Sequence, residues 1–312
     1  MSTPVFPRYS FVQLENSTAT APHCTPDPGF CLPMSDPANV AFHVKFPDID
    51  NYDGNLLYML NYAIPVPCSS TTITTAMTSS TALLFGNHYY STGTDDYRYV
   101  DYHVHFDKPV ATLDECGVAP GDCFKLLLIY YLVVTDPFHD NAETTLGPFG
   151  GSYTNCFMRS SGADTCYSSV IKYWNNSDAF DFDYAWGHTF ASSVELPMYL
   201  RDPKMENEQK VYTRSDGYLV KLYERKEETY MLETDLMPYT WHKNLDIALS
   251  HDTVTISNAN AGSFDPLNTA VQFVKKENYE IEYNKSPLSN LGKGNCKLSN
   301  AQAIHLINNN CG

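Results

Sequence analysis

Alternating apolar and polar residues are the clearest pattern in this chain, and they predict β-strands. Residues 97–106 read YRYVDYHVHF, so polar and apolar side chains take opposite faces of an extended strand. Residues 279–283 read YEIEY, with both glutamates on one face, as in an antiparallel sheet that has one wet face. Residues 124–134 read FKLLLIYYLVV and are apolar on both faces, which predicts a central strand covered on both sides.

Similar runs recur along the chain, separated by clusters of turn-forming residues. Further strands are predicted at residues 40–46, 56–64, 82–85, 169–174, 189–196, 218–223, 229–236, 253–257 and 270–275. Residues 136–165 are predicted to form loops, and Ser299 is a candidate cap for a short helix through Ile307. The expected fold class is therefore mostly β, with antiparallel β-sandwich or jelly-roll-like sheets, few short helices and disulfide staples.

Polarity suggests how the chain is divided. Residues 1–40 are rich in proline and predict an extended N-terminal arm. Residues 201–210, RDPKMENEQK, are the most charged stretch and predict a linker or an exposed loop. This gives a β domain at 41–200 and a second β unit at 211–312 with a disulfide-closed C-terminal segment. The alternative is that the second half completes the sheets of the first.

Composition and charge narrow the function. Hydrophobic residues make up 43% of the 312 residues, which is enough for a core, and 23 Tyr and 16 Phe favour strands. A formal charge of −16 repels phosphate backbones, so we expect no nucleic-acid partner. The sequence contains no apolar stretch of about 18 residues, so we expect no membrane span.

Nine cysteines in a chain of this length predict an oxidising location. Eight of them fall into pairs that are close in sequence: Cys24 with Cys31, Cys116 with Cys123, Cys156 with Cys166, and Cys296 with Cys311. We expect each pair to close a short loop as a disulfide, with Cys68 left free, buried or bound to another chain.

Other features agree with an extracellular protein or one on a virion surface. Asn16, Asn175 and Asn284 begin glycosylation sequons. The first 20 residues lack the apolar core of a signal peptide. Either a mature form or another route of export, such as virion release, would account for that.

The sharpest chemical pattern is Asp101-x-His103-x-His105. Residues two apart in a strand share a face, so both imidazoles could bind one zinc ion, with Asp101 orienting a histidine. Candidates for the third ligand are His88, His188 and, foremost, His139, which follows the expected central strand. Such a strand is similar to the zinc strand of alpha-type carbonic anhydrases and to the metal strand of cupins. The glutamates that accompany the histidines in both families are missing at the expected spacing. The alternative is a polar, solvated strand face.

A second cluster of possible ligands is acidic. Asp48, Asp50 and Asp53 precede Gly54, and clustered oxygens beside a glycine turn suit calcium. The spacing differs from that of an EF-hand, and a surface turn rich in Asp and Asn explains it as well.

Three functions fit these patterns. The first is a structural or binding glycoprotein, extracellular or on a virion surface, that has no catalytic activity, needs no cofactor, has protein or glycan partners and could form oligomers. The second is a zinc-dependent lyase or hydrolase similar to carbonic anhydrase, which would use His103 and His105. The third is a carbohydrate-binding protein stabilised by calcium.

Overall fold

The chain is described by a computed structural model. It covers residues 6–14, 31–34, 40–47, 55–67, 87–89, 97–104, 118–136, 142–160, 168–177, 179–182, 191–258, 271–283, 290–301 and 304–307. These residues form a mostly β structure with antiparallel sheets and one short helix, which confirms the expected fold class at that level.

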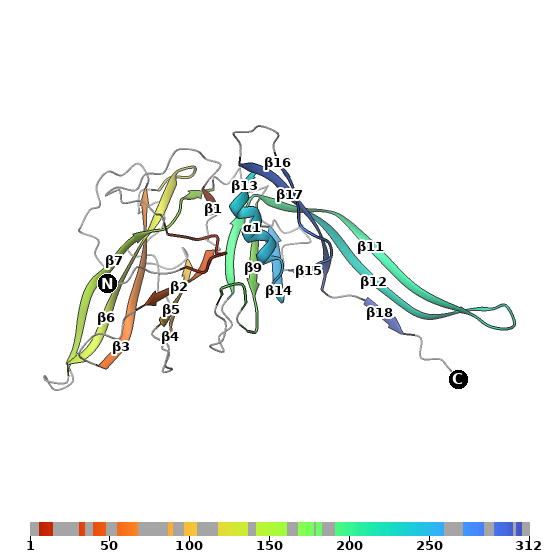
Figure 1. The fold of residues 1–312 in the computed structure, drawn as a ribbon, viewed down its shortest axis with the longest axis horizontal. Coiled ribbons are helices and arrows are strands. Elements are labelled where there is room, and N and C mark those ends of the chain that lie inside the picture. The colour runs from red at the N-terminus through yellow and green to blue at the C-terminus, as the bar shows by residue number, and fades with distance from the viewer. Residues whose placement is uncertain are drawn as a thin grey trace.

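The smaller sheet has five strands. They are β1 (Leu32–Met34), β3 (Asn55–Pro67), β6 (Cys123–Asp136), β7 (Ala142–Tyr153) and β8 (Phe157–Arg159). The order is β1-β8-β6-β3, and β7 also pairs with β6 (Figure 1). Only the β1–β8 pair is parallel among the pairings described. The apolar run predicted to be a central strand is β6, which has neighbours on both edges.

The larger sheet has 13 strands within the described residues. They are β2 (Val40–Pro47), β4 (Asn87–Tyr89), β5 (Tyr97–Val104), β9 (Ser169–Trp174), β10 (Ser192–Leu196), β11 (Met198–Thr213), β12 (Leu219–Thr234), β13 (Met237–Pro238), β14 (Thr253–Asn258), β15 (Val271–Lys275), β16 (Glu280–Tyr283), β17 (Leu291–Asn300) and β18 (Ile304–Ile307). The main path runs β11-β12-β17-β15-β14-β9-β10-β2-β5-β4. In addition, β13 and β16 pair with β17, and β18 pairs with β12.

Buried side chains from both sheets form one core cluster. Phe124 and Phe157 stack in the smaller sheet with ring centroids 5.8 Å apart, and both are fully buried. Phe42 on β2 stacks in the same way on Phe6 from the N-terminal region. The described residues 6–14 therefore pack on the core at Phe6, Phe11 and Val12.

The helix α1 (Tyr239–Ala248) was missed in the sequence. It starts after Pro238, whose φ of −62° suits the residue before a helix. Trp241, Leu245 and Ala248 are buried, and their spacing puts them on one helical face. This helix packs on the larger sheet near β13 and β17 (Figure 1).

Three expectations for local structure are wrong. Residues 201–210 are not a linker, because they lie in β11 and pair with β12. Residues 299–307 are not a helix, because they contain the end of β17 and all of β18. Residues 136–165 are not all loop, because they contain β7 and β8.

The larger sheet contains strands from both sides of residues 201–210. β2, β5, β9 and β10 come from the predicted domain 41–200, and β12, β14, β15 and β17 come from the predicted unit 211–312. β9 pairs with β14 over six residue pairs, from Thr253↔Trp174 to Asn258↔Ser169. The two halves thus share one sheet, while the division of the chain into two folding units stays a prediction.

Candidate functional site: the hairpin arm

A long hairpin leaves the body of the protein. We call β11, β12 and the turn between them the hairpin arm; the two strands pair from Met198↔Thr234 to Thr213↔Leu219. At about 3.4 Å per residue, strands of 16 residues are about 54 Å long. Figure 1 shows the outer end of the arm projecting well beyond the other strands of the larger sheet.

Among the residues that the structure describes, the outer part of the hairpin arm has no third strand beside it. β17 pairs with β12 at Thr229–Glu233, and β18 pairs with it at Tyr223–Lys226. We call residues 210–222, which lie beyond these pairings, the arm tip. Within the described residues, the arm tip is joined to the rest of the sheet only through its own two strands.

A tight turn closes the arm tip. The Gly217 N–H donates to the Arg214 carbonyl, and the Arg214 N–H donates to the Tyr218 carbonyl, at 2.9 and 2.8 Å. Gly217 has a φ of +87°, a conformation that favours glycine. The Asp216 carboxylate accepts the Tyr218 N–H at 3.1 Å. This is a three-residue hairpin turn, which fixes the strand register at the tip.

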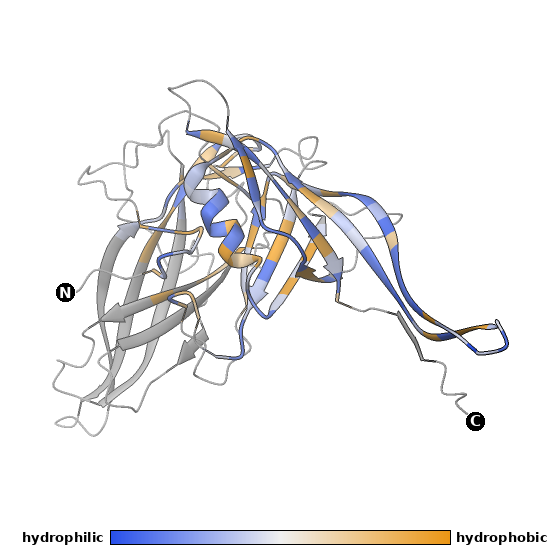
Figure 2. Cartoon of the chain, turned by 45° about the vertical axis from the view of Figure 1, so that its right-hand side comes forward, coloured by the Kyte–Doolittle hydropathy of each residue, from blue (hydrophilic) through white to orange (hydrophobic). Residues whose placement is uncertain are grey.

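The arm tip exposes large apolar side chains. Tyr218 and Leu219 are 72% and 71% exposed, and Val211 and Tyr212 are also exposed. Apolar segments alternate with polar ones out to the end of the arm (Figure 2). Apolar side chains gathered at the end of a projecting element are typical of a surface that contacts another molecule.

The charge of the arm tip is opposite to that of the rest of the protein. Within residues 210–222, Lys210, Arg214 and Lys221 outnumber the one acid, Asp216, for a formal charge of +2. Lys221 also forms an ion pair at 2.6 Å with Glu224, which lies just outside this range. The other residues of the chain carry 17 basic against 35 acidic side chains, a formal charge of −18. The arm tip is thus a basic, apolar projection from an acidic body.

The open edge of β11 is unsuited to pairing with another strand. Pro203 has no N–H to donate, and Asp202 adopts a φ of +53° at an irregularity in the strand register. Charged residues follow along the same strand. These features discourage edge-to-edge β-pairing, so contacts are left to the side chains of the arm tip.

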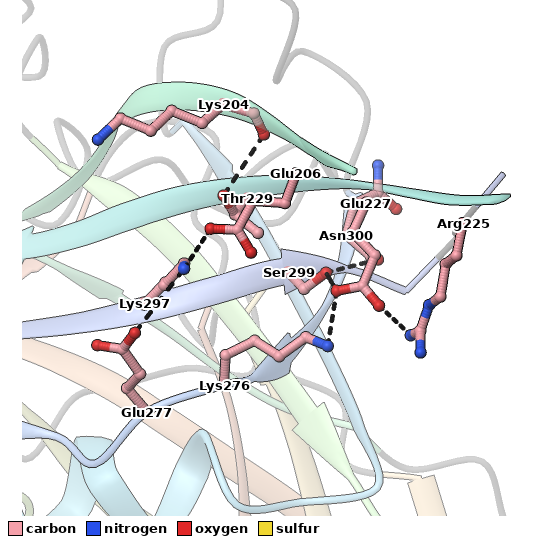
Figure 3. A network of polar contacts seen from close by, with 10 residues as sticks. All are labelled: Lys204, Glu206, Arg225, Glu227, Thr229, Lys276, Glu277, Lys297, Ser299 and Asn300. Atoms are coloured by element: carbon pink, nitrogen blue, oxygen red, sulfur yellow. Dashed lines mark hydrogen bonds and ion pairs between the residues drawn. The ribbon is translucent and has the colours of Figure 1, made fainter. Parts of the chain in front are cut away.

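Polar contacts anchor the base of the hairpin arm (Figure 3). Glu227 on β12 forms ion pairs with Arg225 and with Lys276, the latter at 2.7 Å, and accepts the Ser299 hydroxyl at 3.3 Å. The hydrogen bond from Lys276 and the charges of Lys276 and Arg225 hold the pKa of Glu227 below its ordinary value. The Glu227 carboxylate is thus held ionised between β12, β17 and the residue that follows β15.

A second group of contacts joins β17 to β11. Lys297 pairs with Glu206 on β11 and, at 3.8 Å, with Glu277. The Thr229 hydroxyl donates to the Lys204 carbonyl at 3.4 Å. Lys297 of β17 thus reaches β11, while Ser299 of β17 and Lys276, which follows β15, reach β12. Together these contacts fix the direction in which the arm projects.

The structure places part of the predicted zinc strand. Asp101 and His103 lie in β5, and the register puts His43 of β2 opposite Asp101 and Ala41 opposite His103. His43 was missed as a candidate, although it lies within the strand predicted at residues 40–46. His105 and His139 fall outside the described residues, so the zinc site stays a prediction.

Most other predicted ligands and glycosylation sites also fall outside the described residues. This applies to the calcium candidates Asp48, Asp50 and Asp53, and to Asn16 and Asn284. Asn175 is described and is only 9% exposed. Its side-chain oxygen accepts the Asp252 N–H at 2.6 Å, so the folded protein offers little room for a glycan there.

The disulfide pattern differs from the prediction. Cys31 is joined to Cys156, 125 residues away, while Cys123 and Cys296 carry free thiols. The predicted pairings Cys24–Cys31, Cys116–Cys123, Cys156–Cys166 and Cys296–Cys311 are therefore wrong. Sequence proximity misled because the parallel register of Leu32 with Phe157 brings the preceding cysteines side by side. Cys24, Cys68, Cys116, Cys166 and Cys311 lie outside the described residues.

A buried histidine on α1, His242, has a structural role. The His242 Nε2–H donates to the Gly292 carbonyl at 2.8 Å, so Nδ1 is left to accept the Tyr279 hydroxyl at 2.6 Å. Burial lowers the pKa of His242 and raises that of Tyr279, so both stay neutral. Both ring nitrogens are satisfied, which is the arrangement of a packing residue.

No family model, curated protein or solved structure matches this chain. Among the described residues, none of the helical segments has the length and apolar character needed to cross a membrane. The disulfide indicates a non-reducing setting.

Proposed function

We propose that this protein is a structural component of an outer surface, extracellular or on a virion, that assembles with further copies of itself through the arm tip. The observation that carries the proposal is the arm tip itself, which exposes Tyr218 and Leu219 at the end of a braced hairpin. The outer part of the arm adds little to the protein core, since β11 is exposed on both faces from residue 201 to 213.

Charge supports a second copy as the partner. An arm tip of +2 is attracted to an acidic body of −18, which every further copy also presents. Such a contact joins two different surfaces and is therefore head-to-tail, so it repeats from copy to copy and builds rings or extended arrays. Aromatic side chains such as Tyr218 are suited to be the energetic centre of the contact.

Sedimentation velocity over a wide range of protein concentrations tests the proposal. We expect wild type to form species larger than a monomer as the concentration rises, and Tyr218→Ser/Leu219→Ser to remain monomeric over the same range. The matched control is Tyr239→Ser/Tyr283→Ser, which removes two exposed tyrosines from the body instead. It should associate like wild type.

The charge argument has its own test. Arg214→Glu/Lys221→Glu reverses the sign of the arm tip and should weaken association, and added salt should weaken association of wild type. If wild type stays monomeric at every concentration, the proposal of self-assembly is wrong, and the arm tip would have to contact a different protein. Equal association of the tip variant and the wild type would show that the contact lies elsewhere.

A further inference from the structure

Three cysteines lie close together near the N-terminal ends of β1, β6 and β8 in the smaller sheet. Cys31 precedes β1, Cys156 precedes β8, and Cys123 is the first residue of β6. Their sulfur atoms all lie within 4.8 Å of one another. The Sγ of Cys123 is 3.4 Å from the Sγ of Cys31, which is already bonded to Cys156. A free thiol therefore lies in contact with a disulfide.

The fold holds the three residues in place from different segments of the chain. β1 and β8 pair at Leu32↔Phe157, and β8 and β6 pair at Cys123↔Met158. A turn at residues 119–122 leads into Cys123: the Asp122 N–H donates to the Ala119 carbonyl at 3.0 Å. This arrangement keeps the thiol at one end of the sheet, beside the bond.

The three cysteines differ in how far they are exposed to solvent. Cys31 is 4% exposed, whereas Cys123 and Cys156 are half-buried. The central sulfur is therefore shielded from reagents in solution, while the free thiol is within their reach. A neighbouring thiol has easier access to Cys31 than any external one.

We propose that Cys31, Cys123 and Cys156 form a thiol–disulfide exchange site. The Cys123 thiol loses its proton, the thiolate attacks the Sγ of Cys31, and the Cys31–Cys156 bond breaks. Cys156 leaves as a thiolate and takes up a proton. One disulfide is lost and one is formed, so no external oxidant or reductant is needed. Attack along the axis of the bond requires a rotation of the Cys123 side chain.

The exchange changes which strands are covalently joined. In the structure, β1 is tied to β8 through Cys156; after exchange it is tied to β6 through Cys123. Burial and the neighbouring Asp122 raise the pKa of Cys123, which slows the reaction near neutral pH. β8 contributes Arg159 near the same turn, and β1 contributes no ionisable residue.

Alkylation of the folded, non-reduced protein with N-ethylmaleimide tests the proposal. Tryptic peptides are then mapped by mass spectrometry; Cys156 is the only cysteine between Lys125 and Arg159, so its label is unambiguous. In wild type we expect label on Cys123 and also on Cys156, because exchange exposes the second thiol. In Cys123→Ser the label on Cys156 should be lost.

Two further variants complete the test. Cys156→Ser should form the Cys31–Cys123 disulfide, seen as a cross-link between the peptides that carry these residues. Cys296→Ser removes another free thiol, a buried one, and should leave the labelling of Cys156 unchanged. If Cys156 stays unlabelled in wild type while Cys123 is labelled, exchange does not occur. Equal labelling of Cys156 in wild type and Cys123→Ser also overturns the proposal.

Discussion

Replacing Gly294 with alanine is expected to destabilise the protein strongly. Gly294 lies on β17 against Tyr279, and its N–H donates to the Thr234 hydroxyl at 2.7 Å. A Cβ at this position would overlap the Tyr279 ring and hydroxyl and would lie 3.0 Å from the His242 Nδ1. Tyr279 would have to move away from His242.

The expected cost has two parts. Forcing extra volume into packed surroundings costs about 1–3 kcal/mol. Moving the Tyr279 hydroxyl also leaves the buried His242 Nδ1 without its hydrogen bond, which costs about another 1–3 kcal/mol. Gly294→Ala should therefore lower the free energy of unfolding by about 2–6 kcal/mol.

Urea unfolding followed by circular dichroism measures this loss. Tyr279→Phe removes the hydroxyl, so a protein with this change has no hydrogen bond to His242 left to lose. In that background, the loss of unfolding free energy caused by Gly294→Ala should be smaller by about 1–3 kcal/mol, the contribution of the hydrogen bond. Gly292→Ala is the matched control on the same face of β17. Its Cβ would lie 3.0 Å from Ile281 Cγ2 and breaks no side-chain hydrogen bond, so a loss of about 1–2 kcal/mol is expected.

The stability losses of the two alanine variants test both parts of this estimate. Equal losses in Gly294→Ala and Gly292→Ala would refute the close approach of Tyr279 to β17. A cost of Gly294→Ala that is unchanged in the Tyr279→Phe background would refute the contribution of the hydrogen bond.

Three more predictions concern other parts of the molecule. Glu227→Gln should lower stability by about 1 kcal/mol near pH 7. Because folding lowers the pKa of Glu227, this residue stabilises the folded protein at pH values above its ordinary pKa of 4.5, and the stabilisation is lost as the pH falls through the lower pKa of the folded state. The unfolding free energies of wild type and Glu227→Gln, measured in urea, should therefore become equal in acid. Protein expressed in a secretory eukaryotic host should carry no glycan at Asn175, as checked by glycopeptide mass spectrometry. Metal analysis should give the same zinc content for wild type and His103→Ala/His105→Ala; one equivalent lost in the variant would instead favour a zinc enzyme.

The strands with a buried face were the predictable part of the fold. Residues 169–174 were expected as a strand, and β9 has these bounds. Its sequence showed an apolar pattern because Val170, Ile171 and Tyr173 are buried in the structure. β6 was expected as a central strand from its continuous apolar run. Burial of side chains leaves a pattern in the sequence wherever a sheet has a core side.

The candidate site on the hairpin arm was not predictable in the same way. β11 has exposed side chains on both faces from residue 201 to 213, so its apolar and polar residues do not alternate at every second position, and its sequence resembles a linker. Its pairing with β12 depends on backbone hydrogen bonds, which are independent of side-chain identity. The available signal was Ser215-Asp216-Gly217 between two strand-forming runs, which is typical of a hairpin turn.

The separation of Cys31 from Cys156 also affects the order of events during synthesis. At about 5–20 residues per second, 125 residues take about 6–25 s to follow Cys31 out of the ribosome. Three other cysteines, Cys68, Cys116 and Cys123, emerge during this interval. Oxidation of the growing chain therefore offers Cys31 other partners before Cys156. A Cys31–Cys123 bond could convert through the exchange proposed above, whereas a bond to Cys68 or Cys116 would need another route of rearrangement. Delayed oxidation or a catalyst of disulfide rearrangement should therefore raise the yield, and material from a host without either should improve after refolding in a glutathione buffer.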